Sequence, residues 1–194
     1  MKSRLVLLFI WPITGNRKDT LIISAILWST LFSRLSSTKE KANSLFKEDK
    51  FEEALSLYSE ALEIDKFHAK INAKLFCNKA ACFLKLGKFE EAIEASTKAI
   101  ELDKGYQKAF LRRAQAFIES EEFVKAVKDY QHLIRLDASN SDYKKLLNEA
   151  AVKLQQSKNK DFYTIIGVSK TATIEEIKKA YREAFSWKAT SLKQ

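Results

Sequence analysis

The sequence contains few of the residues that tight turns require. Its 194 residues include four glycines and a single proline, Pro12. A protein built from many short β-strands needs frequent turns, and glycine and proline are the usual residues in them. Leucine, alanine, lysine, glutamate and isoleucine dominate instead, a mixture that favours helix. The composition therefore predicts an all-α protein.

Cysteine is also scarce. Cys77 and Cys82 are five residues apart on a predicted helix, a spacing that turns their side chains about 140° away from each other. Neither an internal disulfide nor a shared metal site is expected at this separation. We expect both thiols to be free and buried or half-buried, as in a reducing compartment.

The sequence also lacks the usual signatures of catalysis and cofactor binding. Four scattered glycines cannot form a phosphate loop or a dinucleotide-binding turn. His68 and His132 do not stand at metal-ligand spacing from a cysteine or from each other, and no paired acid and base is apparent among the carboxylates. We therefore expect a binding protein that is not an enzyme and uses no cofactor or metal.

The net charge of +9 indicates an affinity for anionic partners. A solvated, charge-rich helical surface gives the same net charge, and composition alone favours that simpler interpretation. No basic stripe with interleaved aromatic residues accompanies the charge, so nucleic-acid binding is not expected.

Residues 1–36 differ from the rest of the chain. A basic start leads into an apolar run at 5–11, and a second apolar run covers 21–32. Each is shorter than the ~18 apolar residues that mark a membrane-spanning helix. The first run has the shape of a signal-peptide core, and the second that of a weak anchor or interfacial segment. Three alternatives stay open for this leader: a signal, a membrane anchor, or a gene-model artefact.

One pattern then occurs three times between 51 and 137. Each copy begins with phenylalanine, has alanine three residues later, and ends with an apolar residue, any residue, an apolar residue and aspartate. The closing aspartates, Asp65, Asp103 and Asp137, are 38 and then 34 residues apart. A period of 34 residues with helical patterning is typical of tetratricopeptide repeats. The four extra residues of the first interval amount to about one helical turn.

Three helix pairs and a closing helix are expected from this pattern. The predicted ranges are 38–48 with 51–64, 68–86 with 89–102, 105–119 with 123–136, and a capping helix at 141–157. Ser37 or Thr38 is expected to cap the first helix. Each pair leaves an apolar face that it cannot bury alone, so neighbouring pairs must stack.

Residues 38–157 resemble the tetratricopeptide repeat family in period and in the positions of alanine and aromatic residues. They lack the tryptophan often found early in each repeat and the proline that closes it. The resemblance implies a right-handed superhelix over 37–157, in which the first helix of each pair lines a concave groove.

A polar set stands on these predicted groove-lining helices. Lys39 and Asn43 are four residues apart, Lys108 and Arg112 are four residues apart, and Asn78 lies on the middle helix. Two cations at this spacing cost a few tenths of a kcal/mol unless an anion offsets them. Three cations and two amides that converge can hold a carboxylate through charge-assisted hydrogen bonds. Arg112 would contribute a planar fork, and the two lysines point charges.

These five residues resemble, position by position, the dicarboxylate clamp of co-chaperone tetratricopeptide domains. In that family the clamp holds the free carboxyl terminus and last aspartate of a Glu-Glu-Val-Asp tail. Such tails belong to cytosolic heat-shock chaperones of the seventy- and ninety-kilodalton classes. The resemblance implies a cytoplasmic co-chaperone adaptor. Two alternatives stay open: a membrane-anchored import receptor tethered by residues 1–33, and a lumenal J-protein of the secretory pathway whose leader is a cleaved signal.

Residues 158–194 resemble the opening of a J-domain. The matching segments are Asp-Phe-Tyr at 161–163, Gly-Val at 167–168 and the helical segment 177–182. They predict a short helix, a glycine turn and a capped helix that begins near Thr173. The overall layout resembles that of tetratricopeptide-containing J-proteins of the DnaJ family, subfamily C.

The resemblance to a J-domain is incomplete. The His-Pro-Asp tripeptide with which that family drives ATP hydrolysis by its partner chaperone does not follow, and the third helix of the domain is missing. The resemblance thus implies a truncated J-domain that does not stimulate a chaperone ATPase. It also predicts poor order, because a lone helix leaves Ile174, Ile177, Tyr181 and Phe185 without a packing partner.

Overall fold

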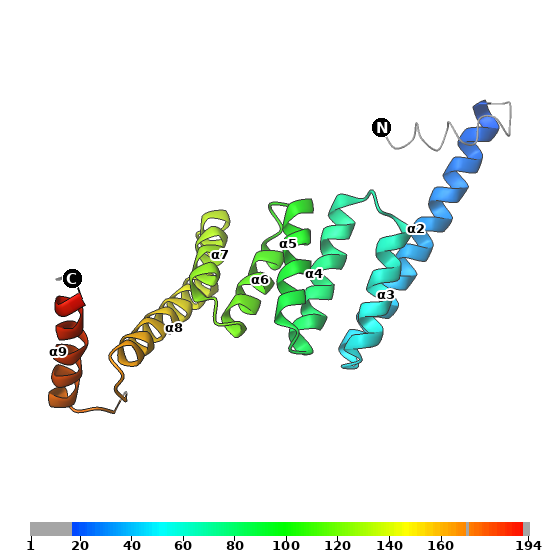
Figure 1. The fold of residues 1–194 in the computed structure, drawn as a ribbon. Coiled ribbons are helices and arrows are strands. Elements are labelled where there is room, and N and C mark those ends of the chain that lie inside the picture. The colour runs from blue at the N-terminus through cyan, green and yellow to red at the C-terminus, as the bar shows by residue number, and fades with distance from the viewer. Residues whose placement is uncertain (1–16, 170, 192–194) are drawn as a thin grey trace. The chain divides into compact units, whose positions relative to one another are not determined.

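The computed structural model describes residues 17–169 and 171–191, and every element in these ranges is an α-helix (Figure 1). The all-α class expected from the composition is therefore confirmed for this part of the chain. The chain divides into two compact units, residues 1–120 and 121–194. The two units are described separately below.

The first unit contains the helices of the first two repeats and the first helix of the third. They are α2 (Arg17–Lys47), α3 (Phe51–Ile64), α4 (Ala69–Lys85), α5 (Phe89–Leu102) and α6 (Gln107–Glu119). Consecutive helices run in opposite directions and pack side by side, and α4 also contacts α6 (Figure 1). The bounds of α3 and α5 are those predicted, and those of α4 and α6 differ from the prediction by one or two residues.

Small side chains make the contacts between these helices close. Ala54 and Ala61 of α3 and Ala92 and Ala99 of α5 have no exposed surface. A methyl group at a helix crossing lets two backbones approach toward the lower end of the usual ~8–10 Å range. The alanine positions of the repeat therefore form the packed interior.

Helix α2 is much longer than the predicted helix at 38–48. It begins at Arg17 and continues unbroken to Lys47. The prediction that Ser37 or Thr38 caps a helix start is therefore wrong, and Thr38 is instead buried along the helix, with 8% of its surface exposed. Neither glycine nor proline occurs between 17 and 47, so nothing in the sequence interrupts the helix.

The N-terminal half of α2 extends beyond α3 (Figure 1) and presents apolar side chains on every side. The exposed members are Leu21, Ile22, Ile23, Ile26, Leu27, Leu31 and Phe32. By length and composition alone, the helix is long and apolar enough to cross a membrane from Leu21 onward, a test that a signal sequence near the N-terminus also passes. The alternatives for the leader therefore stay predictions, and its first apolar run, 5–11, lies outside the described residues.

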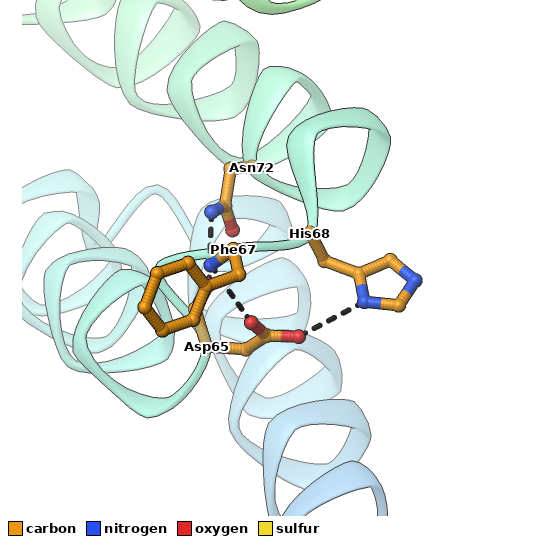
Figure 2. A network of polar contacts seen from close by, with 4 residues as sticks. All are labelled: Asp65, Phe67, His68 and Asn72. Carbon is orange, nitrogen blue, oxygen red and sulfur yellow. Dashed lines mark hydrogen bonds and ion pairs between the residues drawn. The ribbon is translucent and has the colours of Figure 1, made fainter. Parts of the chain in front are cut away.

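Asp65 organises the connection between α3 and α4 (Figure 2). Its carboxylate accepts the Phe67 N–H at 2.9 Å and lies 3.0 Å from Nδ1 of His68. The Asn72 side chain reaches back from the first turn of α4 and donates to the Asp65 carbonyl at 2.8 Å. Asp65 thereby ends one helix and positions the start of the next.

The closing aspartates of the later repeats make the same kind of side-chain to backbone hydrogen bond. The carboxylate of Asp103 accepts the Gly105 N–H at 3.1 Å, and that of Asp137 accepts the Ser139 N–H at 3.2 Å. A side-chain oxygen that accepts the N–H two residues later forms an Asx turn, which stops the chain from continuing as a helix. The repeated aspartate thus supplies the helix stop that the family's closing proline would supply.

The second unit contains α7 (Phe123–Leu136), α8 (Ser141–Ile165) and α9 (Ile174–Ser191), with α7 packed against α8. The bounds of α7 are those predicted. Helix α8 covers the predicted capping helix but does not end at 157, so the separate short helix expected after it is part of α8. The sequence from 141 to 165 has no glycine or proline to separate the two.

Helices α8 and α9 are bounded by the predicted turn and cap. The chain leaves α8 at Gly167, where φ is +71°, and the Val168 N–H donates to the Tyr163 carbonyl. Thr173 and Glu176 form a capping box: the Thr173 N–H donates to the Glu176 carboxylate at 2.8 Å, and the Glu176 N–H donates to the Thr173 hydroxyl at 3.3 Å. The capped start near Thr173 is confirmed.

The expected poor order of the last helix stays a prediction. Ile174 is 71% exposed and Tyr181 is 52% exposed, and the Phe185 side chain lies outside the described residues. The assignment of 158–194 to an incomplete J-domain likewise stays a prediction, and its boundary falls inside α8.

Gly87 offers a test of the turn inside the second repeat. Its φ is +71°, a conformation that costs an L-residue about 1 kcal/mol relative to glycine. Gly87→Ala should therefore lower the free energy of unfolding by about 1 kcal/mol, measured by urea denaturation of the full chain. Gly105→Ala is the control, because that glycine is outside the left-handed region and an added Cβ would meet only ordinary contact. Equal effects of the two substitutions would contradict this account.

Candidate functional site

The five predicted site residues lie on three helices of the first unit. Lys39 and Asn43 are on α2, Asn78 is on α4, and Lys108 and Arg112 are on α6. These three helices are the first members of successive repeats, and we call the side that carries these residues the first-helix face. The four-residue spacing places both members of each pair on one side of its helix.

Three of the five residues are joined directly. Nδ2 of Asn78 donates to Oδ1 of Asn43 at 3.3 Å. Nη1 of Arg112 donates to Oδ1 of Asn78 at 3.4 Å, and also to the backbone carbonyl of Cys77. These contacts connect α2 to α4 and α4 to α6. The structure thus brings Asn43, Asn78 and Arg112 together, and their role in binding stays a prediction.

Tyr58 joins this network from α3. Its hydroxyl donates to Oδ1 of Asn43 at 2.6 Å, and the residue is 2% exposed. Burial raises the pKa of Tyr58 to about 12, so the hydroxyl stays protonated and able to donate at neutral pH. With two donors on its oxygen, the Asn43 amide is held in one orientation. Tyr58 is not among the five residues chosen from the sequence; the signal that could have found it is its hydroxyl, which needs a hydrogen-bond partner when buried.

The two lysines of the predicted set lie beside the network rather than in it. Lys39 is half-buried and Lys108 is exposed, each one helical turn before its partner on α2 or α6. Within the residues that the structure describes, neither side chain has a hydrogen bond or an ion pair. Lys108 is nevertheless close enough for its positive charge to act on the buried thiol of Cys77.

Both cysteines are buried and free, as expected. Burial raises the pKa of Cys77, against the lowering effect of the Arg112 charge, and raises that of Cys82 to about 11. Both thiols therefore stay protonated at neutral pH and behave as small apolar residues. Sγ of Cys77 lies 3.1 Å from Nη1 of Arg112, so this side chain also contacts the guanidinium.

Charge alternates between the helices of the first unit. Helix α4 carries four lysines and no acidic residue, and α6 carries three cations and one glutamate. Helix α3 carries four glutamates and no cation, and α5 carries four glutamates and one lysine. The positive charge is therefore concentrated on the first helices of the repeats. This face attracts anions more strongly than an even distribution of the same charges would.

The histidines hold no metal site in this part of the chain. Nδ1 of His68 lies 3.0 Å from the Asp65 carboxylate, and Nδ1 of His132 lies 3.5 Å from a guanidinium nitrogen of Arg135. Among the described residues, no three metal-ligating side chains come together.

The five predicted site residues carry amide, guanidinium and ammonium donors, which are the groups that bind anions.

Two sequence-family models, each described as tetratricopeptide repeat, match residues 34–105 and 83–150. DnaJ homolog subfamily C member 7 from Mus musculus is 46% identical over 149 residues, or 77% of this chain. Its homolog from Schizosaccharomyces pombe is 42% identical over 157 residues, or 79% of this chain. The alignments cover 30% and 33% of those relatives, so the chain spans about a third of their length.

Two solved structures with bound peptides have a similar fold. The second TPR domain of the human RPAP3 protein, in complex with the HSP70 peptide SGPTIEEVD, is 32% identical, with a TM-score of 0.57 over 62% of this chain and 98% of that one. The first TPR of Spaghetti (RPAP3), bound to the HSP90 peptide SRMEEVD, is 28% identical, with a TM-score of 0.58 over 63% of this chain and 97% of that one.

A double-mutant cycle tests whether Tyr58 supports Asn43. Tyr58→Phe removes the donor at 2.6 Å, and Asn43→Ala removes the acceptor. Each should lower the free energy of unfolding by about 1 kcal/mol, with a coupling of similar size because the second change costs less once the first is made. Urea denaturation of the full chain measures all four free energies. Strictly additive effects would show that the contact does not stabilise the protein.

Proposed function

Because the chain belongs to the tetratricopeptide repeat family, with tetratricopeptide-containing DnaJ proteins among its relatives, we propose that it is a co-chaperone adaptor. Its ligands would be the acidic carboxyl-terminal tails of heat-shock chaperones of the seventy- and ninety-kilodalton classes, in the cytoplasm. The observation that carries this proposal is the contact of Asn43, Asn78 and Arg112 on the cationic first-helix face. The function is binding rather than catalysis.

The proposed ligand presents two carboxylates close together, the chain terminus and the side chain of the last aspartate. Arg112 is held through Nη1, which leaves Nη2 to donate to one of them. Nδ2 of Asn43 is the neighbouring donor, because its Oδ1 is already engaged by Tyr58 and Asn78. Charge-assisted hydrogen bonds of this kind are about twice as strong as neutral ones.

The network also prepares the site before a ligand arrives. A free arginine side chain loses rotamer freedom when it binds, at a cost of roughly 0.5–1.5 kcal/mol. Contacts of Arg112 with α4 already restrict that freedom. Lys39 and Lys108 add charge without being held in one position, which suits point-charge attraction of a carboxylate.

The bound peptides of the similar structures support this ligand class. Both peptides end in Glu-Glu-Val-Asp, and the two domains are 32% and 28% identical to this chain. The relatives named DnaJ homolog subfamily C member 7 support the co-chaperone role. Because the chain spans about a third of their length, the activities of those whole proteins are not carried over.

Fluorescence anisotropy of a labelled peptide ending in Glu-Glu-Val-Asp, titrated with the full chain, tests the proposal. We expect a micromolar Kd that weakens as salt is raised, because the contacts are charged. Amidation of the peptide carboxyl group and Arg112→Ala should each abolish measurable binding.

Arg113→Ala is the matched control for this titration. Its guanidinium stacks 5.5 Å from the Phe110 ring and donates to the Thr97 hydroxyl, away from the network. This variant should bind like the parent chain while circular dichroism shows that it is folded. Absence of binding by folded parent protein, or equal binding of the amidated peptide, would reject the clamp.

The exposed apolar half of α2 favours a second function, a membrane-tethered receptor with the same clamp. Its apolar side chains lie all round the helix, whereas a helix that docks on another protein needs one apolar face. Under this alternative, full-length tagged chain should sediment with membranes and resist extraction by high salt. Replacement of Ile22, Ile26 and Leu27 by serine should release it. Recovery of the unaltered chain in the soluble fraction would favour the cytoplasmic adaptor.

A further inference from the structure

One lysine on α4 occupies the position that two predicted clamp lysines occupy on the neighbouring first helices. Lys39, Lys74 and Lys108 are separated by 35 and then 34 residues, one repeat each. They lie on α2, α4 and α6 respectively. Lys74 was not among the predicted site residues, because the sequence pattern of the clamp places only an asparagine on the middle helix.

The position of Lys74 relative to the network is also the same. It precedes Asn78 by four residues, as Lys108 precedes Arg112, so it lies one turn from the network on the same side of α4. Because α4 packs beside α6 in the first unit and both run in the same direction (Figure 1), the two lysines lie at the same level of the first-helix face. A row of three lysines therefore flanks the row of Asn43, Asn78 and Arg112.

Lys74 has no structural role that would explain its position. It is exposed, and within the described residues it forms no hydrogen bond or ion pair. Helix α4 offers it no carboxylate, and Lys70, four residues earlier, is a second cation. Lys79 on the same helix differs: its Nζ donates to the Ser59 hydroxyl at 2.9 Å, and burial lowers its pKa. Lys79 thus contributes to packing, whereas Lys74 is exposed and has no hydrogen bond or ion pair among the described residues.

We infer that Lys74 forms a subsite for an acidic side chain of the bound peptide, upstream of its terminal aspartate. This inference rests on the proposed function. A Glu-Glu-Val-Asp tail carries four negative charges, whereas Lys39, Lys108 and Arg112 supply three positive ones; Lys74 supplies the fourth. The five-residue clamp would bind the terminal carboxylate and the side chain of the last aspartate, and Lys74 would bind one of the two glutamates.

The length of an extended peptide indicates which of the two glutamates can reach Lys74. An extended chain advances ~3.3 Å per residue, so the glutamate two residues before the end lies roughly 7 Å from the terminal aspartate. Neighbouring packed helices are roughly 8–10 Å apart. A peptide anchored at α6 and Arg112 therefore places that glutamate about one helix away, over α4. The Lys74 side chain is long enough to adjust to it.

Binding of three peptides to the full chain and to Lys74→Ala tests this subsite. The peptides end in Glu-Glu-Val-Asp, in Glu-Gln-Val-Asp, and in Gln-Glu-Val-Asp. We expect Lys74→Ala to weaken binding of the first by about three- to fivefold, as for a partly exposed ion pair. It should have little effect on Glu-Gln-Val-Asp, whose partner carboxylate is gone, and should weaken Gln-Glu-Val-Asp as it weakens the first.

Lys41→Ala is the matched control. Lys41 is also exposed and without an ion pair among the described residues, but it lies about 200° around α2 from Lys39 and should leave every affinity unchanged. Equal effects of Lys74→Ala and Lys41→Ala on peptide affinity would overturn the subsite while leaving the clamp intact. An equal loss of affinity for all three peptides in Lys74→Ala would do the same. Failure of the folded parent chain to bind any of the peptides would overturn both the subsite and the proposed function.

Discussion

Close approach of helices at alanine is the constraint on which the rest of the first unit depends. Ala54, Ala61, Ala92 and Ala99 are fully buried, and even one added methylene group at such a crossing forces neighbouring side chains or backbone to move. The same close packing brings α2, α4 and α6 within side-chain reach. Without it, the hydrogen bonds from Asn78 to Asn43 at 3.3 Å and from Arg112 to Asn78 at 3.4 Å, which link three different helices, could not form together.

The polar network satisfies some of its groups inside the protein and leaves others to a ligand. Oxygen atoms of Asn43 and Asn78 accept hydrogen bonds from neighbours, and one terminal nitrogen of Arg112 is engaged. The groups left over are donors and cations. The folded chain therefore carries uncompensated positive charge on one face, while the second helices of the repeats carry carboxylates. Such an unfavourable local arrangement is expected where a protein binds an anion.

Most of the fold could be predicted from the sequence, because each helix of a repeat follows from its own apolar pattern. The bounds of α3, α5 and α7 were predicted to the residue. The start of α2 was not, because a serine–threonine pair resembles a helix cap locally, whereas only the absence of a breaker upstream decides that the helix continues. The five polar residues were chosen from their spacing and from their resemblance to the co-chaperone clamp, and the structure joins three of them, Asn43, Asn78 and Arg112. The contribution of Tyr58 could not be predicted, because it depends on which hydroxyl a neighbouring helix brings to Asn43. Lys74 could not be predicted either, because the family's clamp pattern has no cation at that position.

Helix α2 joins two surfaces of different chemistry without a linker. Its apolar half begins at Leu21, and the same unbroken helix carries Lys39 and Asn43. A helix turns by 100° per residue, so the angle between the apolar half and the two polar residues is set by the number of residues that separate them. A membrane or protein that binds the apolar half of α2 therefore also sets the direction in which the first-helix face points. An insertion of one residue between Phe32 and Lys39 would therefore turn the apolar half of α2 by about 100° relative to Lys39 and Asn43.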